Sequence, residues 1–469
     1  MPSFMEPFRI KAVEPIPFPT PGERREALEA AGYNLFRVPA RLITIDLLTD
    51  SGTSAMSAAQ WSALVSGDES YAGARSFERF ERVVTELTGF GEVLPVHQGR
   101  AAERILLHGL LRPGRLCVAN THFDSTRASV LAAGAEAVDL PVPVPAGTVL
   151  PFGGNIDLTA LEHLLSGPDG GRVACVVLTV TNNANGGQPV SLENAAQTRR
   201  LCRRHGVPLL LDASRFAENA YLVGTRSPAH AGATPRELAR AMFDLADGCW
   251  ASLKKDGVAN IGGLIALRDP ELARRCADQL IETEGFPTYG GLAGRDLDAL
   301  AQGLLEVTDP AYLRYRAESA GWFAERLERA GLPVVRPAGC HAVYVDAGRL
   351  LGHIPPHELP ATAFAIELYL AGAVRVTELG TLVFGRPDPA GGPDLPAPSE
   401  LVRFALPRRV YTSNHLEYVA EVAGEVAAKV SAIRGYRITE QTGALRQFAA
   451  TLAPLGGHRE RPPRPPLLR

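Results

Sequence analysis

Short apolar runs that alternate with helical patterns constrain the fold more than any other feature of this sequence. The runs span Arg115–Ala119, Ala137–Leu140, Val173–Thr181, Pro208–Asp212 and Asp247–Leu253. Such alternation is typical of a mostly parallel sheet joined by crossover helices. We therefore expect an α/β fold whose binding site lies at the carboxyl ends of the strands.

Beyond Asp309 the pattern changes to shorter strands and longer helices. A long helix is predicted at Ala311–Ala330, ending at Gly331, and a last helix at Leu416–Ile433. Strands are predicted between them, at Ala342–Val345, Ala373–Glu378 and Val402–Ala405. This region is expected to form a second, smaller α+β domain.

The chain is expected to contain two domains, because its 469 residues exceed one compact core. A Pro-rich N-terminal region is typical of an arm, and a Pro- and Arg-rich C-terminal region is typical of disorder. The predicted segments are 1–45 (arm, part of the small domain), 46–309 (large domain), 310–453 (small domain) and 454–469 (disordered tail).

Charge and composition exclude several classes of protein. The net charge of −3 gives no overall attraction for nucleic acid or for an anionic membrane. The N-terminus lacks the apolar region of a signal peptide, and no apolar run is long enough to span a bilayer. The six cysteines stand far apart, as reduced thiols do. We expect a cytoplasmic protein.

The stretch 247–263 (DGCWASLKKDGVANIGG) places Lys255 just beyond an apolar strand. Burial and nearby cations both lower the pKa of a lysine, which makes Lys255 a candidate Schiff-base amine. Taken alone, the stretch also fits a surface loop with a pair of lysines. A second candidate site precedes the helix Ala101–Leu111. There Gly99, flanked by Gln98 and Arg100, could bind phosphate, although an ordinary turn fits as well.

Further candidates lie at the ends of other predicted strands. Asp212 could hold the protonated nitrogen of a pyridine cofactor, or it could cap a helix or pair with Arg215. Asn183 could donate to the cofactor's 3-oxygen, or it could be a turn residue. Phe123 could stack on a flat ring, or it could belong to the core.

Eight motifs in this order resemble the tryptophanase/tyrosine phenol-lyase family: LLTDSGT, DESYAGARS, HQGRAAE, GGQPVSL, LLLDASRFAENAY, SLKKDG, EGFPTYGGLAGRD and LVRFALPRRVYT. The resemblance runs from about Glu6 to Phe448. It implies β-eliminating lyases that use pyridoxal 5′-phosphate (PLP) and the fold type I of PLP-dependent transferases. In that fold a mostly parallel seven-stranded sheet forms the large domain.

The resemblance also implies roles for particular residues around PLP. Lys255 matches the Schiff-base lysine, and Asp212 matches the partner of the ring nitrogen. Phe123 matches the stacking aromatic residue, and Asn183 and Arg215 match the partners of the 3-oxygen. The matching phosphate-binding residues are Gln98, Gly99, Arg100, Ser252 and Lys254.

Other matches concern the substrate and the assembly. Arg403 matches the arginine that binds the substrate carboxylate, and Thr49 and Ser51 lie in the matching substrate loop. Tyr71 matches a general-acid tyrosine that serves the neighbouring subunit's site. The resemblance therefore implies a homo-oligomer, with a dimer of dimers expected. The matching potassium site consists of Gly52, Glu69 and Asn260.

The substrate pocket resembles that of tryptophanase more than that of tyrosine phenol-lyase. Leu379, in TELG, and Asp124 are tryptophanase-like choices. Gln447, in LRQF, instead replaces the histidine of tryptophanases and cannot act as an acid near neutral pH. Phe36 and Phe448 match further pocket residues, although packing of the N-terminal arm explains Phe36 equally well.

The expected reaction is PLP-dependent β-elimination of tryptophan or a modified tryptophan, giving an indole-type product, pyruvate and ammonia. Lys255 would remove the Cα proton, and Tyr71 would help to protonate the leaving group. Another β-substituted alanine, such as tyrosine or an S-substituted cysteine, remains an alternative substrate. An aminotransferase is a weaker alternative, and a PLP-binding regulator of DNA is the weakest.

Overall fold

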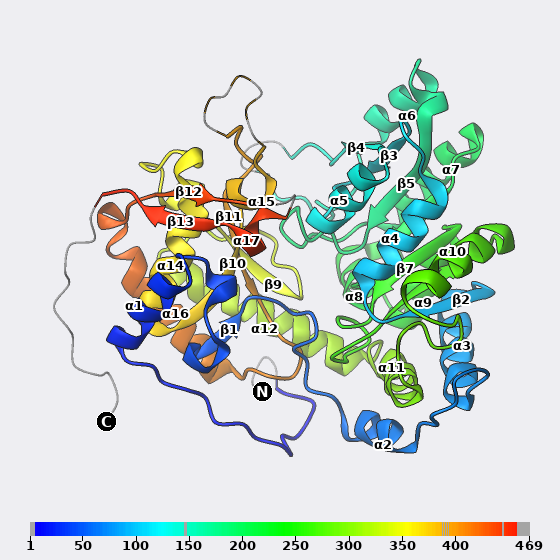
Figure 1. Cartoon of the computed structure of the whole chain (residues 1–469), viewed down its shortest axis with the longest axis horizontal. Helices are drawn as coiled ribbons and strands as arrows, with labels where there is room; N and C mark the ends of the chain where they lie inside the picture. Colours follow the sequence, from blue (N-terminus) through cyan, green and yellow to red (C-terminus); the bar gives the residue numbers. More distant parts are fainter. Residues whose placement is uncertain are drawn as a thin grey trace.

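The computed structural model describes residues 5–144, 148–386, 388, 390, 392, 394–442 and 445–456. Two sheets, each with its own apolar core, form two lobes that face each other (Figure 1). Within the described ranges, no helix is long and apolar enough to cross a membrane. Residues 457–469, which make up most of the predicted disordered tail, lie outside the described residues.

The large sheet has seven strands in the order β2-β8-β7-β6-β5-β3-β4. The strands are β2 (Glu92–Val96), β3 (Leu116–Ala119), β4 (Glu136–Asp139), β5 (Val173–Thr179), β6 (Leu209–Asp212), β7 (Gly248–Ser252) and β8 (Gly263–Leu267). All run parallel except β8, which is antiparallel to both its neighbours. The predicted apolar runs form β3 to β7, so the α/β prediction is confirmed.

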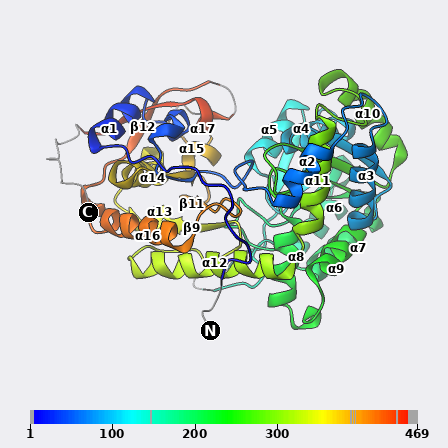
Figure 2. The same cartoon turned by 90° about the horizontal axis from the view of Figure 1, so that it is seen from below.

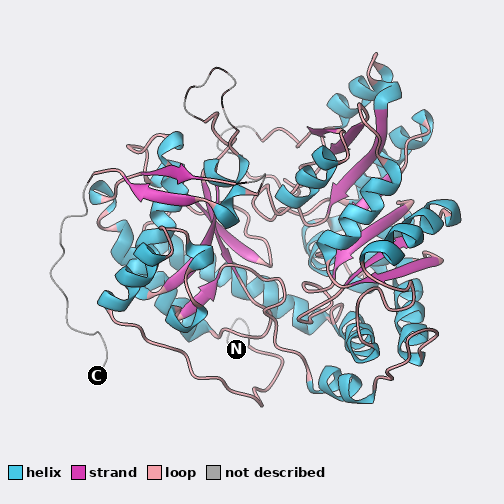
Figure 3. Ribbon diagram, viewed as in Figure 1, coloured by secondary structure: helices cyan, strands magenta, loops and turns pink. Residues whose placement is uncertain are grey.

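Both faces of this sheet are buried, because its residues alternate between two apolar cores. On β5, Val176 and Leu178 face one core, whereas Cys175 and Val177 face the other. Helices flank the strands on both sides (Figure 3), which is why the strands are continuous apolar runs. The helices of this lobe are α2 (Ala58–Ser66), α3 (Arg75–Thr88), α4 (Gly99–Leu110), α5 (Asp124–Ala132), α6 (Leu158–Ser166), α7 (Leu192–His205), α8 (Phe216–Arg226), α9 (Pro235–Asp244), α10 (Pro270–Thr283) and α11 (Gly294–Glu306).

The small sheet has the order β1-β10-β11-β9. Its strands are β1 (Ile45–Leu47), β9 (Ala342–Asp346), β10 (Val374–Leu379) and β11 (Leu401–Ala405), and a separate hairpin pairs β12 (Tyr436–Glu440) with β13 (Thr451–Pro454). The helices of this lobe are α1 (Pro21–Ala30), α12 (Pro310–Arg329), α13 (Ala347–Leu350), α14 (Pro360–Gly372), α15 (Thr381–Phe384), α16 (Ser413–Ala427) and α17 (Arg446–Ala449). Because β1 pairs with β10, the N-terminal segment contributes to the small sheet through Leu47. The predicted domain limits stay a proposal.

The predicted helix Leu416–Ile433 is too long at its C-terminal end. In the structure α16 stops at Ala427, and a separate 3₁₀ turn follows at Val430–Ala432. Helix α12 contacts both α16 of the small lobe and α8 of the large lobe, so it connects the two lobes, as Figure 2 shows.

A cluster of buried charges joins the lobes beneath α12. Arg408, which follows β11 and is fully buried, donates to Asp50 (3.0 Å), to Asp256 (2.8 Å) and to Glu218 of α8 (3.2 Å). Asp50 also accepts two hydrogen bonds from Arg215. Burial opposes the ionisation of Asp50, but Arg215 and Arg408 hold its pKa well below the usual range. One ion cluster therefore contains residues of the small lobe, of the large lobe and of the loop that follows β1.

Removal of the Arg408 guanidinium should destabilise the fold strongly. Arg408→Met leaves buried carboxylates without their shared counter-ion, which costs about 3–5 kcal/mol for a buried pair. We expect a clearly lower urea midpoint for unfolding. Arg274→Met, which removes an arginine paired with Glu271 and Asp278 on the surface of α10, provides the control and should leave the midpoint unchanged. Equal midpoints for the two variants would contradict a role for the cluster in joining the lobes.

Candidate active site

A cavity lies at the carboxyl ends of the parallel strands, and segments of the small lobe cover it. Most of the predicted site residues line it together. They are Phe36, Thr49, Ser51, Gln98, Gly99, Arg100, Phe123, Asp124, Asp212, Arg215, Ser252, Lys254, Lys255, Leu379, Arg403, Gln447 and Phe448. Residues from the whole length of the chain therefore meet at one site.

Lys255 enters this cavity from the turn that follows β7. In this turn the backbone N–H of Lys255 donates to the Ser252 carbonyl (3.1 Å). Burial, and then the positive charge of Arg215, lower the pKa of Lys255 to about 8. Lys254 adds a further positive charge nearby. A lysine with this pKa is partly neutral at physiological pH, as a nucleophilic amine must be.

The residues around the N-terminus of α4 fit a phosphate group. Gln98 caps the helix, and its Oε1 accepts from Lys254 Nζ (3.3 Å). Ser252 Oγ is buried and has no hydrogen-bond partner among the described residues. A Cβ on Gly99 would lie 2.4 Å from Ser252 Cβ, so glycine keeps this space open. An unpaired hydroxyl, free helix N–H groups and two cations are the donors that a phosphate needs.

Asp212 fits the role of a partner for a ring nitrogen. It ends β6, lines the cavity and accepts hydrogen bonds from the Ser214 backbone N–H (3.1 Å) and Oγ (2.7 Å). The alternative ion pair with Arg215 is wrong, because Arg215 binds Asp50 instead (2.7 and 2.9 Å). The carboxylate of Asp212 is therefore left for another partner.

Phe123 and Asn183 lie beyond the strands that the sequence predicted them to end. Strand β3 stops at Ala119, and Phe123 is the N-cap of α5. Strand β5 stops at Thr179, and Asn183 lies in the following turn. Phe123 lines the cavity. Both residues lie beyond their strands for the same reason: the chain leaves the sheet and turns before it reaches either of them.

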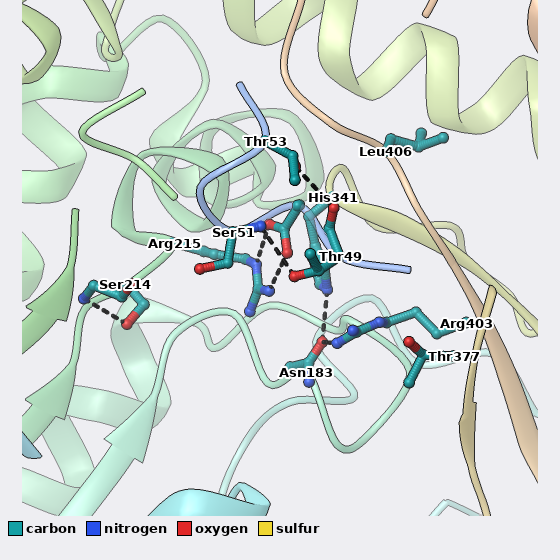
Figure 4. Close-up of polar contacts among 12 residues, drawn as sticks. Thr49, Ser51, Thr53, Asn183, Ser214, Arg215, His341, Thr377, Arg403 and Leu406 are labelled. Carbon is teal, nitrogen blue, oxygen red and sulfur yellow. Dashed lines mark hydrogen bonds and ion pairs between the residues drawn. The ribbon is translucent and has the colours of Figure 1, made fainter. Parts of the chain in front are cut away.

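Asn183 does not line the cavity, but it contacts the arginine that does. Asn183 Oδ1 accepts from Arg403 Nη1 (3.0 Å), and His341 Nε2 lies 3.0 Å from the same oxygen (Figure 4). Tyr344 OH also donates to this oxygen (2.9 Å). Burial lowers the pKa of His341 well below its usual range, so the imidazole is neutral. Asn183 Nδ2 is buried and unpaired within the described structure, as a donor awaiting a ligand would be.

Arg403 lies on β11 and points into the site from the small lobe (Figure 4). Its Nη2 donates to the Leu48 carbonyl (3.0 Å), and its Nε is buried without a partner among the described atoms. Thr49 and Ser51 lie in the turn after β1, where Thr49 Oγ1 accepts from the Ser51 N–H (3.1 Å). The fixed guanidinium and this turn could together bind a carboxylate.

The far side of the cavity is an apolar wall with one acidic group. The Phe36 and Phe448 rings meet edge to face with centroids 4.8 Å apart, and Leu379 lies beside them in the lining. Gln447 Nε2 donates to Asp124 Oδ2, and burial raises the pKa of Asp124. The wall suits a flat aromatic group that carries one hydrogen-bond donor.

Of the remaining predicted residues, Gly52 and Asn260 contact each other, whereas Tyr71 and Glu69 have other partners in this chain. Tyr71 is 70% exposed and packs against Phe286 and Tyr289, away from the cavity of its own chain. Asn260 Nδ2 donates to the Gly52 carbonyl (3.0 Å), whereas Glu69 pairs with Arg295 (3.4 Å). Across the described residues, no group of three or more His, Cys, Asp or Glu side chains could hold a metal ion. The roles of Tyr71 and of the cation site stay predictions.

Glu103, which was not among the predicted residues, lines the cavity from α4. Burial, and then the charge of Asp212, raise the pKa of Glu103 to about 8. Its carboxyl accepts from Thr126 Oγ1 (3.0 Å) and Ser125 Oγ (3.3 Å). An acidic residue among the buried apolar positions Ala102 and Ile105 was the available signal. Further lining residues that were missed are Leu48, Ser125, Ser214, Trp250, Thr377 and Val383.

The pKa of Lys255 gives a prediction for the PLP-free protein. A lysine reacts with an aldehyde as the neutral amine, so its reductive methylation accelerates as the pH rises through its pKa. The midpoint for Lys255 should lie near pH 8, against about 10.4 for a lysine in a reference peptide. Mass spectrometry can follow each site, because the chain has four lysines: Lys11, Lys254, Lys255 and Lys429. A midpoint near that of the peptide would contradict the buried, cation-rich setting.

The glycine at the start of α4 gives a second prediction. Gly99→Ala should weaken PLP binding by about tenfold or more, because the added methyl group displaces Ser252 from the phosphate position. Titration with PLP, followed by absorbance, measures this change. Gly91→Ala is the matched control, since a Cβ there meets nothing within 4 Å. Equal affinities for the two variants would refute the phosphate-binding role.

Comparisons with known proteins identify the family of this chain. The family model described as "Beta-eliminating lyase" matches residues 46–422. The tryptophanase of Hyphomonas neptunium is 52% identical over 453 residues, which cover 96% of this chain and 99% of the relative. The tyrosine phenol-lyase of Pasteurella multocida is 40% identical over 451 residues, covering 96% and 98%.

Solved structures resemble this chain in fold. A serine palmitoyltransferase of Sphingomonas wittichii has a TM-score of 0.56 at 14% identity, over 83% of this chain and 88% of that chain. The threonine aldolase of Leishmania major has a TM-score of 0.55 at 15% identity, over 82% and 99%. The sequence comparisons show the family as well as the fold: the chain belongs to the beta-eliminating lyase family and is a PLP-dependent lyase.

Proposed function

We propose that this chain catalyses the β-elimination of L-tryptophan, in which tryptophan and water give indole, pyruvate and ammonia. The proposal rests on one observation. A single cavity is lined by Lys255, by the residues around the N-terminus of α4 that fit a phosphate, by Arg403 and by an apolar wall next to Asp124. The identity to tryptophanases supports the choice of substrate.

The residues present fit PLP. Gln98, Gly99, Arg100, Ser252 and Lys254 would hold its phosphate, Asp212 its ring nitrogen, and Phe123 its ring face. Lys255 would form the covalent link to its aldehyde, and Asn183 Nδ2 and Arg215 would lie towards its 3-oxygen. When bound, PLP supplies an electron sink next to the substrate Cα.

The chain's own residues would then bind the substrate and move its protons. Arg403 would bind the α-carboxylate, and its contact with Asn183 fixes the guanidinium for that role. The Lys255 amine, with a pKa of about 8, would accept the Cα proton. The bond between Cβ and the indole ring would then break, and the leaving group would take up a proton.

The apolar wall would receive the indole ring. Asp124, held by Gln447, would accept a hydrogen bond from the indole N–H. Tyr71 would protonate the ring in the neighbouring subunit's site, which is consistent with its exposure in the single chain. We include in the proposal a homo-oligomer, a dimer of dimers, with potassium at Gly52, Glu69 and Asn260, acting in the cytoplasm.

The test is pyruvate release by the PLP-loaded enzyme with potassium present. We expect indole and pyruvate from L-tryptophan, and a loss of about 1,000-fold or more in Lys255→Ala, because the base and the cofactor link are both removed. Lys429→Ala is the control, since Lys429 lies outside the cavity lining and should leave turnover unchanged. Turnover of S-alkyl-L-cysteines or L-tyrosine alone would refute the proposed substrate. Amino transfer without pyruvate from any of them would refute elimination.

A further inference from the structure

The apolar wall combines Leu379, at the end of β10, with three short segments that lie far apart in the sequence. The 3₁₀ turn η1 (Leu35–Arg37) carries Phe36, α15 adds Val383 to the wall, and α17 carries Gln447 and Phe448. Segments of one turn do not hold their own conformation in water. Contacts from outside the cavity must therefore set the position of this wall.

Asn34 joins the first segment to the third. Its Nδ2 donates to the Gln447 carbonyl (3.1 Å) and to the Ala450 carbonyl (2.8 Å), and its Oδ1 accepts from the Phe36 N–H (3.0 Å). The side chain is buried, with 3% of its surface exposed. One amide thus fixes the backbone on both sides of the Phe36–Phe448 edge-to-face contact.

Arg446 joins the third segment to the second. Its guanidinium donates to the carbonyls of Leu382 (2.7 Å) and Thr381, both in α15, and it pairs with Asp394. The residue is buried, with 6% exposed. Next to it in the chain, Gln447 reaches Asp124 of the large lobe. The position of α17 therefore determines both the apolar surface and its polar contact.

We propose that Asn34 and Arg446 are positioning residues that fix the wall for an aromatic leaving group. Neither residue lines the cavity, so their effect must pass through Phe36, Val383, Gln447 and Phe448. The preference for aromatic over alkyl leaving groups then depends on these two residues. The inference rests on the proposed elimination reaction, but it does not require that tryptophan be the substrate.

The experiment compares two thiolate leaving groups that differ in size. S-(2-nitrophenyl)-L-cysteine presents an aromatic group to the wall, and S-methyl-L-cysteine does not reach it. In the PLP-loaded variants Asn34→Leu and Arg446→Met, kcat/KM for the aromatic substrate should fall by about tenfold or more. We expect kcat/KM for S-methyl-L-cysteine to stay within about threefold, and the absorbance of bound PLP to stay unchanged.

Arg326→Met is the matched control, because it removes an arginine pair with Glu417 between α12 and α16, away from the wall. Its ratio of the two kcat/KM values should equal that of the wild type. If Arg446→Met does not fold, the same ratio of kcat/KM values is measured in Arg446→Lys and Asn34→Leu, and it tests the inference in the same way. An unchanged ratio, or a parallel loss for both substrates, would overturn the inference while the wild type still eliminates. A wild type that releases no pyruvate would instead overturn the proposed function, and the inference with it.

Discussion

The buried ion cluster around Arg408 is the interaction on which the arrangement of the site depends. Asp50 lies between Thr49 and Ser51 in the proposed substrate loop, and Asp256 directly follows Lys255. One guanidinium therefore fixes both this loop and the turn that carries Lys255. Buried charges tolerate little displacement, since every lost partner leaves a charge in a medium of low polarity. The cluster thus fixes the positions of residues from both lobes relative to one another.

The same electrostatics prepare the cavity for anionic ligands. Arg100, Lys254, Arg215 and Arg403 bring positive charge to the lining. Glu103, with a pKa of about 8, is mostly protonated at pH 7 and removes little of it. In the proposed function, the PLP phosphate and the substrate α-carboxylate would bind to these cations. Burial, and then the charge of Arg215, lower the pKa of Lys255 to about 8, so the same setting would support both binding and proton transfer.

Much of the fold could be predicted because buried parallel strands are recognisable as apolar runs. The runs at Val173–Thr181 and Asp247–Leu253 became β5 and β7 with small changes at their ends. Strand β8 was not predicted. Its antiparallel direction could not have been predicted either, because neither the length nor the composition of Gly263–Leu267 shows how the strand pairs. Strand ends moved where backbone hydrogen bonding stops before the apolar pattern does.

The position of a residue was predictable where it ends a strand, as Asp212 does, or lies in the turn just after one, as Lys255 does. It was not predictable where contacts depend on the packing of the two lobes. His341 and Tyr344 meet Asn183 from more than 150 positions away, and no local pattern marks them. Asn34 and Arg446 likewise bind backbone carbonyls, which carry no sequence signature. Tyr71 and Glu69 face away from the cavity, so their predicted roles depend on a second copy of the chain.

In the proposed reaction, Lys255 removes a Cα proton from an amino acid held by Arg403. The most direct measurement is the exchange of the Cα hydrogen of L-alanine for deuterium in heavy water, followed by NMR with the PLP-loaded enzyme. Alanine has no leaving group, so the exchange isolates the proton transfer from elimination. We expect exchange at Cα in the wild type, much slower exchange in Arg403→Met and none in Lys255→Ala. Exchange in Lys255→Ala at the wild-type rate would contradict this role of Lys255.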